Sequence, residues 1–257
     1  MPSTPPARPE RQAEAPATGL PGPASPPVPP DPPWRSTPRA GRPPRPELSR
    51  EAVIDAALAV LADVGPDGLT MRRVATELGT AAASLYGYVA NKEELIELVI
   101  DRVLAEVPVP DVDSDDWRAE SKRYMLDCRD AFARHRGTAG LTLGRVPFGP
   151  NSLVLIEASM GILRKAGLPD RVCGFAGDLF GLYMGAAVHE SEMWQEGDQG
   201  GEEQLAMMQE WFLSLPPAQF PNMLALAGAM VEGTGDERFE WGLDVLIRGL
   251  ASYISEA

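Results

Sequence analysis

The sequence predicts an all-α protein with an N-terminal three-helix head and a larger helical domain after it. Apolar residues recur at helical spacing after residue 47, and no stretch of any length alternates as a β-strand would. Residues 1–46 differ, because they hold 17 of the 26 prolines and almost no aliphatic residue. That segment buries too little apolar surface to offset its ordering entropy, so we expect residues 1–46 to be a disordered arm.

The first helix of the head follows Ser49, a residue type that caps helix N-termini. Gly65 and Gly68 close this helix. Its apolar stripe consists of Val53, Ile54, Ala57, Leu58 and Leu61.

Residues 70–89 predict two short helices joined by a glycine turn. Thr70 can cap the first helix, Gly79 provides the left-handed turn residue, and Leu85 and Val89 face the core. Small residues and hydroxyls remain on or near the exposed surface of the second helix: Ala82, Ala83, Ser84, Tyr86, Gly87 and Tyr88. Such a helix fits the DNA major groove, which indicates a helix-turn-helix; an ordinary helical hairpin is the alternative.

A capping box, Asn91-Lys92-Glu93-Glu94, predicts the start of a further helix that links the head to the rest of the chain. Residues 47–107 then form a complete DNA-binding domain. In it, Thr70, Tyr86 and Lys92 are expected to hold phosphates, and Arg72 a base edge or phosphate. Ser84 and the methyls of Ala82 and Ala83 are expected to meet base edges or thymine methyls. Tyr88 is also expected to belong to this DNA-binding surface.

The head resembles those of the TetR family of bacterial transcriptional regulators. The resemblance rests on Gly68-Leu69-Thr70, Arg72, Val74-Ala75, Leu78-Gly79, Ser84-Leu85-Tyr86, Val89 and Asn91-Lys92-Glu93-Glu94-Leu95. It implies a homodimeric repressor whose two heads each read one half of a palindromic operator in double-stranded DNA. It also implies that residues 108–257 form a helical domain for dimerisation and for binding a small-molecule inducer.

The charge of the chain bears on DNA binding in two ways. The net charge is −14, and residues 47–107 hold 11 acids against 5 bases, but phosphate contact depends on local charge. Between Thr70 and Lys92, three bases outnumber the single acid Glu77. The acidity of the whole chain then predicts modest non-specific binding and strong salt sensitivity, not absence of binding. Before the head, Arg39, Arg42 and Arg45 form either an arm for the minor groove or a solvated linker.

Beyond Pro108 the pattern predicts helices over 117–135, 150–166, 170–194, 216–232 and 237–255. Residues 196–203 are expected to be a mobile acidic loop, and 204–215 a short helix or an ordered loop. The helix over 170–194 is rich in glycine and alanine, which favours close helix contact. Together with the C-terminal helix it predicts a four-helix dimer interface, unless the two helices simply pack within one monomer.

This second domain resembles the sensing domains of the tetracycline repressors within the same family, through Trp117, 135–147 and 239–250. The resemblance implies a cavity with 141–147 as its moving link. The implied ligand residues are Tyr124, Cys128, Thr142, Arg145, Ser159 and His189. Thr142 replaces the histidine that holds drug-bound magnesium, so we expect no metal, no cofactor and a different apolar ligand. Tyr124 and Cys128 are equally consistent with ordinary core positions.

Other functions are weakly supported. His135 and His189 are the only histidines, and neither lies in a catalytic or metal-binding motif, so no catalytic residue is predicted. A helical enzyme with an apolar pocket and a protein-binding adaptor are the alternatives. Two cysteines, no signal peptide and no window expected to span a membrane predict a cytoplasmic, nucleoid-associated bacterial protein.

Overall fold

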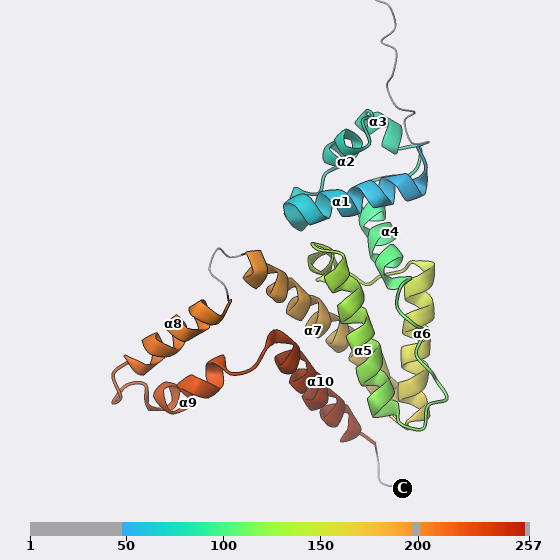
Figure 1. Cartoon of the computed structure of the whole chain (residues 1–257). Coiled ribbons are helices and arrows are strands. Elements are labelled where there is room, and N and C mark those ends of the chain that lie inside the picture. The colour runs from blue at the N-terminus through green and yellow to red at the C-terminus, as the bar shows by residue number, and fades with distance from the viewer. Residues whose placement is uncertain (1–47, 197–200, 255–257) are drawn as a thin grey trace, which may run out of the picture. The chain divides into compact units, whose positions relative to one another are not determined.

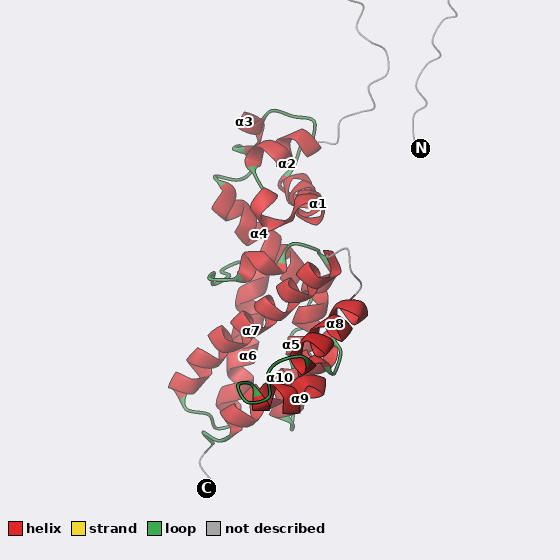
Figure 2. Ribbon diagram, turned by 90° about the vertical axis from the view of Figure 1, so that its left-hand side faces the viewer, coloured by secondary structure: helices red, strands yellow, loops and turns green. Residues whose placement is uncertain are grey.

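The computed structural model describes residues 48–196 and 201–254, which belong to one compact unit, Arg45–Ala257. Within these two ranges the chain forms ten α-helices and one 3₁₀ helix and no strand, so the all-α prediction is confirmed (Figure 2). Predictions made for residues 1–47 and 197–200 lie outside the described residues.

The head contains four helices, α1 (Arg50–Gly68), α2 (Met71–Glu77), α3 (Ala82–Leu85) and α4 (Lys92–Leu104) (Figure 1). The predicted caps are confirmed, because the side chains of Ser49, Thr70 and Asn91 each accept a hydrogen bond from a backbone N–H three residues later. The helix α1 bends at Gly65, whose φ of 68° is left-handed, and Pro66 follows directly.

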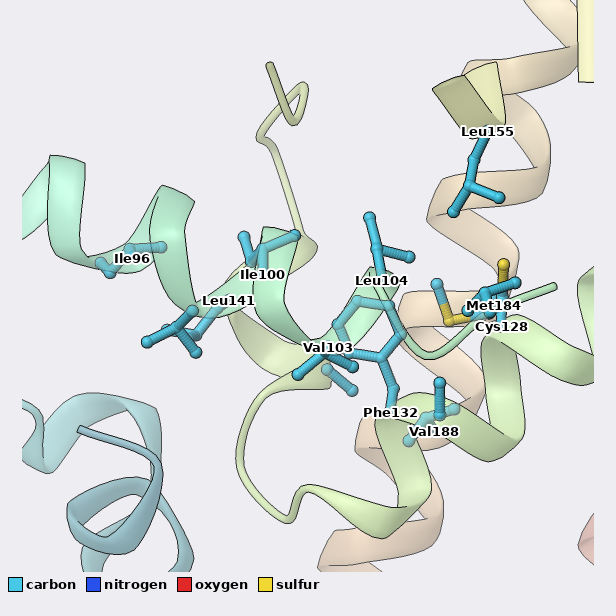
Figure 3. Packing of buried hydrophobic residues seen from close by; sticks show 14 of the residues in the cluster. Ile96, Ile100, Val103, Leu104, Cys128, Phe132, Leu141, Leu155, Met184 and Val188 are labelled. Atoms are coloured by element: carbon cyan, nitrogen blue, oxygen red, sulfur yellow. The ribbon is translucent and has the colours of Figure 1, made fainter. Parts of the chain in front are cut away.

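The larger domain is built around α7 (Asp170–Glu196), which packs against the 3₁₀ helix η1 (Ala139–Thr142) and against α5 (Trp117–Arg134), α6 (Pro150–Lys165) and α10 (Gly235–Ala251). The helix α4 leaves the head and also packs on α5, α6 and η1. Figure 3 shows Leu104 of α4, Phe132 of α5 and Met184 of α7 gathered in one core. The linking helix therefore shares its buried face with the larger domain.

The remaining two helices, α8 (Gly201–Leu213) and α9 (Pro221–Val231), pack mainly on each other (Figure 1). The segment predicted as a short helix or ordered loop is thus the helix α8. The predicted helix over 216–232 begins five residues later, at Pro221. Proline suits the first position of a helix, because the N–H that it lacks would have no partner within the helix there.

The prediction from the sequence also misplaced both ends of α10. The helix begins at Gly235 and not at Glu237, because Thr234 and Glu237 form a capping box. It ends at Ala251 rather than at Ser255.

The prediction that no window is long and apolar enough to span a membrane was wrong for α7. By length and composition alone, Asp170–Trp194 is apolar enough to cross a membrane. Its contacts with η1, α5, α6 and α10 are nevertheless those of a central helix within a helical domain.

Candidate functional site

The two helices α2 and α3 form a helix-turn-helix around one positive-φ glycine. Gly79 has a φ of 62°, and the N–H of Thr80 returns to the carbonyl of Ala75, which closes the end of α2. Val74 and Leu85 are fully buried, so they fix the crossing of the two helices from the core side. The second helix has only four residues, and the chain continues through a turn at 86–88.

The predicted DNA-contacting residues divide by exposure. Those on the surface are Thr70, Arg72, Ala83, Ser84 and Tyr86. Ala82, Tyr88 and Lys92 are half-buried, and Ala82 and Tyr88 pack against the core of the head. The structure therefore presents the first group on the surface and gives part of the second group a packing role.

The two arginines of α2 differ in what they contact. The guanidinium of Arg73 donates to the carbonyl of Gly68 at 3.1 Å and so covers the end of α1. The guanidinium of Arg72 is exposed, and none of the residues the structure describes pairs with it. Arg72 is thus a cation free to meet a phosphate or a base edge.

Arg50, at the start of α1, braces the head in a way the sequence did not reveal. Its Nε donates to the carbonyl of Tyr88, and its Nη2 donates to the carboxylate of Glu94, each at 3.1 Å. Glu94 also accepts from the N–H of Ala90, one residue before the predicted capping box, and not from the N–H of Asn91 as that box would have it. These bonds join α1, the turn after α3 and the start of α4, over sequence distances that no local pattern encodes.

The larger domain encloses a cavity of about 470 Å³. Its walls come from α5, α6, α7 and the segment 142–147, and the last residue of α4, Leu104, also reaches it. The structure brings five of the six predicted ligand residues to its lining: Tyr124, Cys128, Thr142, Arg145 and Ser159. A cavity of this size is within the range of small-molecule sites.

The polar groups of the cavity are mostly neutral or already bonded. Burial raises the pKa of the Cys128 thiol to about 12, against a smaller lowering by its hydrogen bond with Tyr124, and burial also raises the pKa of the Tyr124 phenol. Thr142 donates to the carbonyl of Ala139 and Ser159 to that of Ile156, each at 2.8 Å. Arg145 is exposed, so the enclosed part of the cavity suits an apolar ligand.

His189, the sixth predicted ligand residue, does not line the cavity. It lies against η1, where a Cβ on Gly140 would be 3.3 Å from its Nδ1. That nitrogen is buried and has no hydrogen-bond partner among the described residues. In the same ranges of the chain, no three His, Cys, Asp or Glu side chains come together as a metal site.

Comparison with known proteins agrees with this geometry. Residues 53–99 match the family described as "Bacterial regulatory proteins, tetR family", and residues 109–254 match the "Tetracyclin repressor-like, C-terminal domain". Similar proteins are the transcriptional repressor DrrR1 of Streptomyces coeruleorubidus, at 28% identity over 87% of this chain and 84% of that one, and the class A tetracycline repressor of Escherichia coli, at 32% over 80% and 91%.

Among solved structures, the Streptomyces coelicolor TetR family protein ActR in complex with actinorhodin is similar, with a TM-score of 0.74 and 37% identity. The match covers 81% of this chain and 98% of ActR. Both the helix-turn-helix head and the cavity-bearing domain match models of the same family. The chain is a member of the TetR family of transcriptional regulators.

Proposed function

We propose that a small apolar inducer binds in the cavity of this regulator and releases the dimer from a palindromic operator by moving α4. The family membership makes the protein a ligand-responsive, DNA-binding homodimeric repressor of the cytoplasm, and not an enzyme. The observation that carries the proposal is the position of Leu104, which ends α4 and also lines the cavity. A ligand in the cavity would thus press on the helix that carries the head.

The chemistry of the cavity favours an apolar ligand over a magnesium chelate. Phe132, Phe180 and Met184 contribute to its lining, and the hydroxyl of Thr142 already donates to Ala139. ActR, which is 37% identical, binds actinorhodin. We therefore propose actinorhodin as a first ligand to try, beside apolar compounds small enough for the cavity.

On the DNA side, the proposed contacts follow from exposure and charge. Arg72 reaches a base edge or a phosphate, Thr70, Tyr86 and Lys92 hold phosphates, and Ser84 with the methyls of Ala82 and Ala83 meets base edges. Tyr88 supports this surface from its half-buried position. The two heads of the dimer would sit about 34 Å apart, one turn of DNA, on the two half-sites.

The dimer interface is proposed to come from α7 and α10. These helices contact each other within the subunit, yet each also leaves large apolar side chains exposed. Phe175 on α7 is 63% exposed and Trp241 on α10 is 70% exposed. Two helices from each subunit would then form the four-helix interface that a two-fold symmetric operator requires.

The proposal is tested by selecting genomic fragments bound by the purified full-length protein, and then adding actinorhodin to the complexes. We expect a palindromic fragment to be enriched and to be released in proportion to the actinorhodin added. A matched control is the variant Ser159→Phe, which narrows the cavity without changing the head. It should bind the same fragment and respond less to actinorhodin. Failure to enrich any palindrome would contradict the DNA-binding part of the proposal.

The basic arm is tested separately. Arg39, Arg42 and Arg45 lie outside the described residues, and we propose that they enter the minor groove beside each half-site. Deleting residues 1–46 should then weaken operator binding and reduce its salt dependence. An unchanged salt dependence would favour the linker alternative. Association with the nucleoid, which follows from operator binding, is measurable by fluorescence microscopy in the host.

A further inference from the structure

A buried carboxylate on α4 holds the start of α6. Asp101 is only 6% exposed, and its Oδ1 accepts from both the backbone N–H and the Oγ of Ser152, each at 2.9 Å. Its Oδ2 accepts from the Nδ2 of Asn151 at 2.8 Å. Burying a carboxylate is costly unless its oxygens are satisfied, and here three donors from one helix end satisfy them.

The sequence of α6 leaves room for this contact. Its N-cap residue is Gly149, which has no side chain to cap the helix, and Pro150 at the first helical position has no N–H. A Cβ on Gly149 would overlap the carboxylate of Asp101. One free N–H at the N-terminus of α6, that of Ser152, is therefore capped by a residue of another helix, whose negative charge also suits the positive end of the helix dipole.

This contact lies between the head and the cavity. Asp101 is in the last turn of the helix that starts at the head, at Lys92. Ser152, its partner, lines the cavity, as does the segment 144–147 that leads into α6. A shift of this segment that carries the start of α6 with it would move the three donors, which belong to Asn151 and Ser152, away from Asp101.

The geometry points to Asp101 as the residue that couples the cavity to the DNA-binding head: its bonds to α6 hold α4 in the operator-binding position, and displacement of the start of α6 releases it. This inference rests on the proposed function of the cavity. The other buried contacts of α4, such as those of Val103 and Leu104, are apolar and have no preferred direction. The bonds of Asp101 are directional, so they distinguish one position of α4 from another.

The test compares Asp101→Asn and Asp101→Ala with Glu97→Gln in the full-length dimer, without any ligand. Glu97 is an exposed carboxylate on the same helix, so its variant matches the change in charge. We expect both Asp101 variants to weaken operator binding by between about 5-fold and 150-fold, the usual range of coupling between sites. Glu97→Gln should bind as the parent protein does. Ser152→Ala, which removes one of the three donors, should fall between them.

A structural role alone would lower stability without moving the heads, so a second readout is needed. Spin labels at Glu77→Cys in each subunit report the distance between the two heads. We expect a narrow distance distribution in the parent protein and in Glu97→Gln, and a broader or shifted one in Asp101→Asn. Hydrogen exchange of the amides at 151–155 should rise in the Asp101 variants only.

The inference is overturned if Asp101→Asn loosens the start of α6 but keeps the parent operator affinity and head distance. Should Asp101→Ala not fold, Asp101→Asn and Ser152→Ala carry the same test. The outcome is independent of the inducer, because no ligand is used. Failure of actinorhodin to bind would contradict the proposed ligand and leave these measurements as they stand.

Discussion

The carboxylate of Glu192 on α7 accepts a hydrogen bond from the backbone N–H of Gly137, with 2.7 Å between Oε1 and N. Gly137 has a φ of 80°, and a Cβ there would lie 2.6 Å from the carbonyl oxygen of Leu61 on α1. One glycine thus joins the central helix of the larger domain to the first helix of the head. Close approach of the two backbones is possible only because this residue has no side chain.

Gly137→Ala should therefore destabilise the protein through two effects. A left-handed φ costs a residue with a side chain about 1–2 kcal/mol, and the overlap with Leu61 adds to that cost. Thermal unfolding followed by circular dichroism should show a lower midpoint, and operator binding should weaken because α1 is displaced.

Gly144→Ala is the matched control for this prediction. Gly144 has a similar φ of 71°, but a Cβ there would meet nothing within 4 Å. The Gly144→Ala variant is destabilised by the left-handed φ but not by an overlap, so its unfolding midpoint should fall less. Equal losses in the two variants would mean that the contact with Leu61 contributes nothing.

A second glycine lets α10 approach α7. The ring of Tyr183 stacks on Phe239 with 5.2 Å between centroids, and its hydroxyl donates to the carbonyl of Phe239 at 3.1 Å. A Cβ on Gly242 would overlap that hydroxyl. Gly242→Ala should lower the free energy of unfolding by about 1–3 kcal/mol, the usual cost of overpacking.

Gly249→Ala on the same helix provides the contrast. Nothing lies within 4 Å of a Cβ at Gly249, so the change should stabilise α10 by up to about 1 kcal/mol through helix propensity. Urea denaturation of both variants measures the difference. If Gly242→Ala were as stable as Gly249→Ala, Tyr183 would have to move without loss, and the packing described for α7 and α10 would be wrong.

The features predicted from the sequence were those encoded over short distances. The caps at Ser49, Thr70 and Asn91 each join residues three apart, so a local pattern suffices to find them. The capping box at Thr234 is an equally local signal, and it was missed because the apolar pattern alone placed the start of the last helix.

The features missed depend on residues brought together by the fold. Arg50 meets Tyr88 across 38 positions, and Asp101 meets Ser152 across 51. Neither pair has a spacing that signals contact. The cavity residues were found through the resemblance and not through spacing, and His189 shows its limit, because that side chain packs against η1 and not in the cavity.

Arg72 is predicted to be the main charged contact of the reading surface. Arg72→Ala should weaken binding to the selected operator by about 1–3 kcal/mol if it meets a base edge, and should relax the preference at that base pair. Fluorescence anisotropy with the operator and with single-base variants measures both effects. Arg73→Ala is the control, because Arg73 is already bonded to Gly68 and its loss should affect stability more than sequence preference. Retention of full operator binding by Arg72→Ala would refute the assignment.

Tyr86 is predicted to act differently. Its side chain is 55% exposed, and its hydroxyl is expected to reach a phosphate. Tyr86→Ala should therefore weaken binding to all sequences alike, with Tyr86→Phe sharing the loss. A change of base preference in Tyr86→Ala would show that the residue reads bases.

The end of α4 is tied to the end of α5 by a carboxylate whose pKa predicts a pH dependence. Glu106 accepts from His135 Nε2 at 2.6 Å and from Arg134 Nη2 at 2.9 Å. Burial raises the pKa of Glu106, but the bonds from His135 and Arg134 outweigh burial and hold it below the ordinary value of 4.5. Because the folded pKa is lower than the unfolded one, this contact stabilises the fold above pH 4.5, and the stabilisation is lost as pH falls through the folded pKa.

Glu106→Gln should thus be less stable than the parent protein at about pH 7, and the difference should shrink as the pH falls below 4.5. Denaturant titrations at several pH values measure this, with the exposed Glu97→Gln as a control whose difference should stay small throughout. The loss should be modest, because the Glu106 side chain is 37% exposed and solvent screens its partners. A difference that grew on acidification would mean that the folded pKa of Glu106 is raised, and that burial outweighs the bonds from His135 and Arg134.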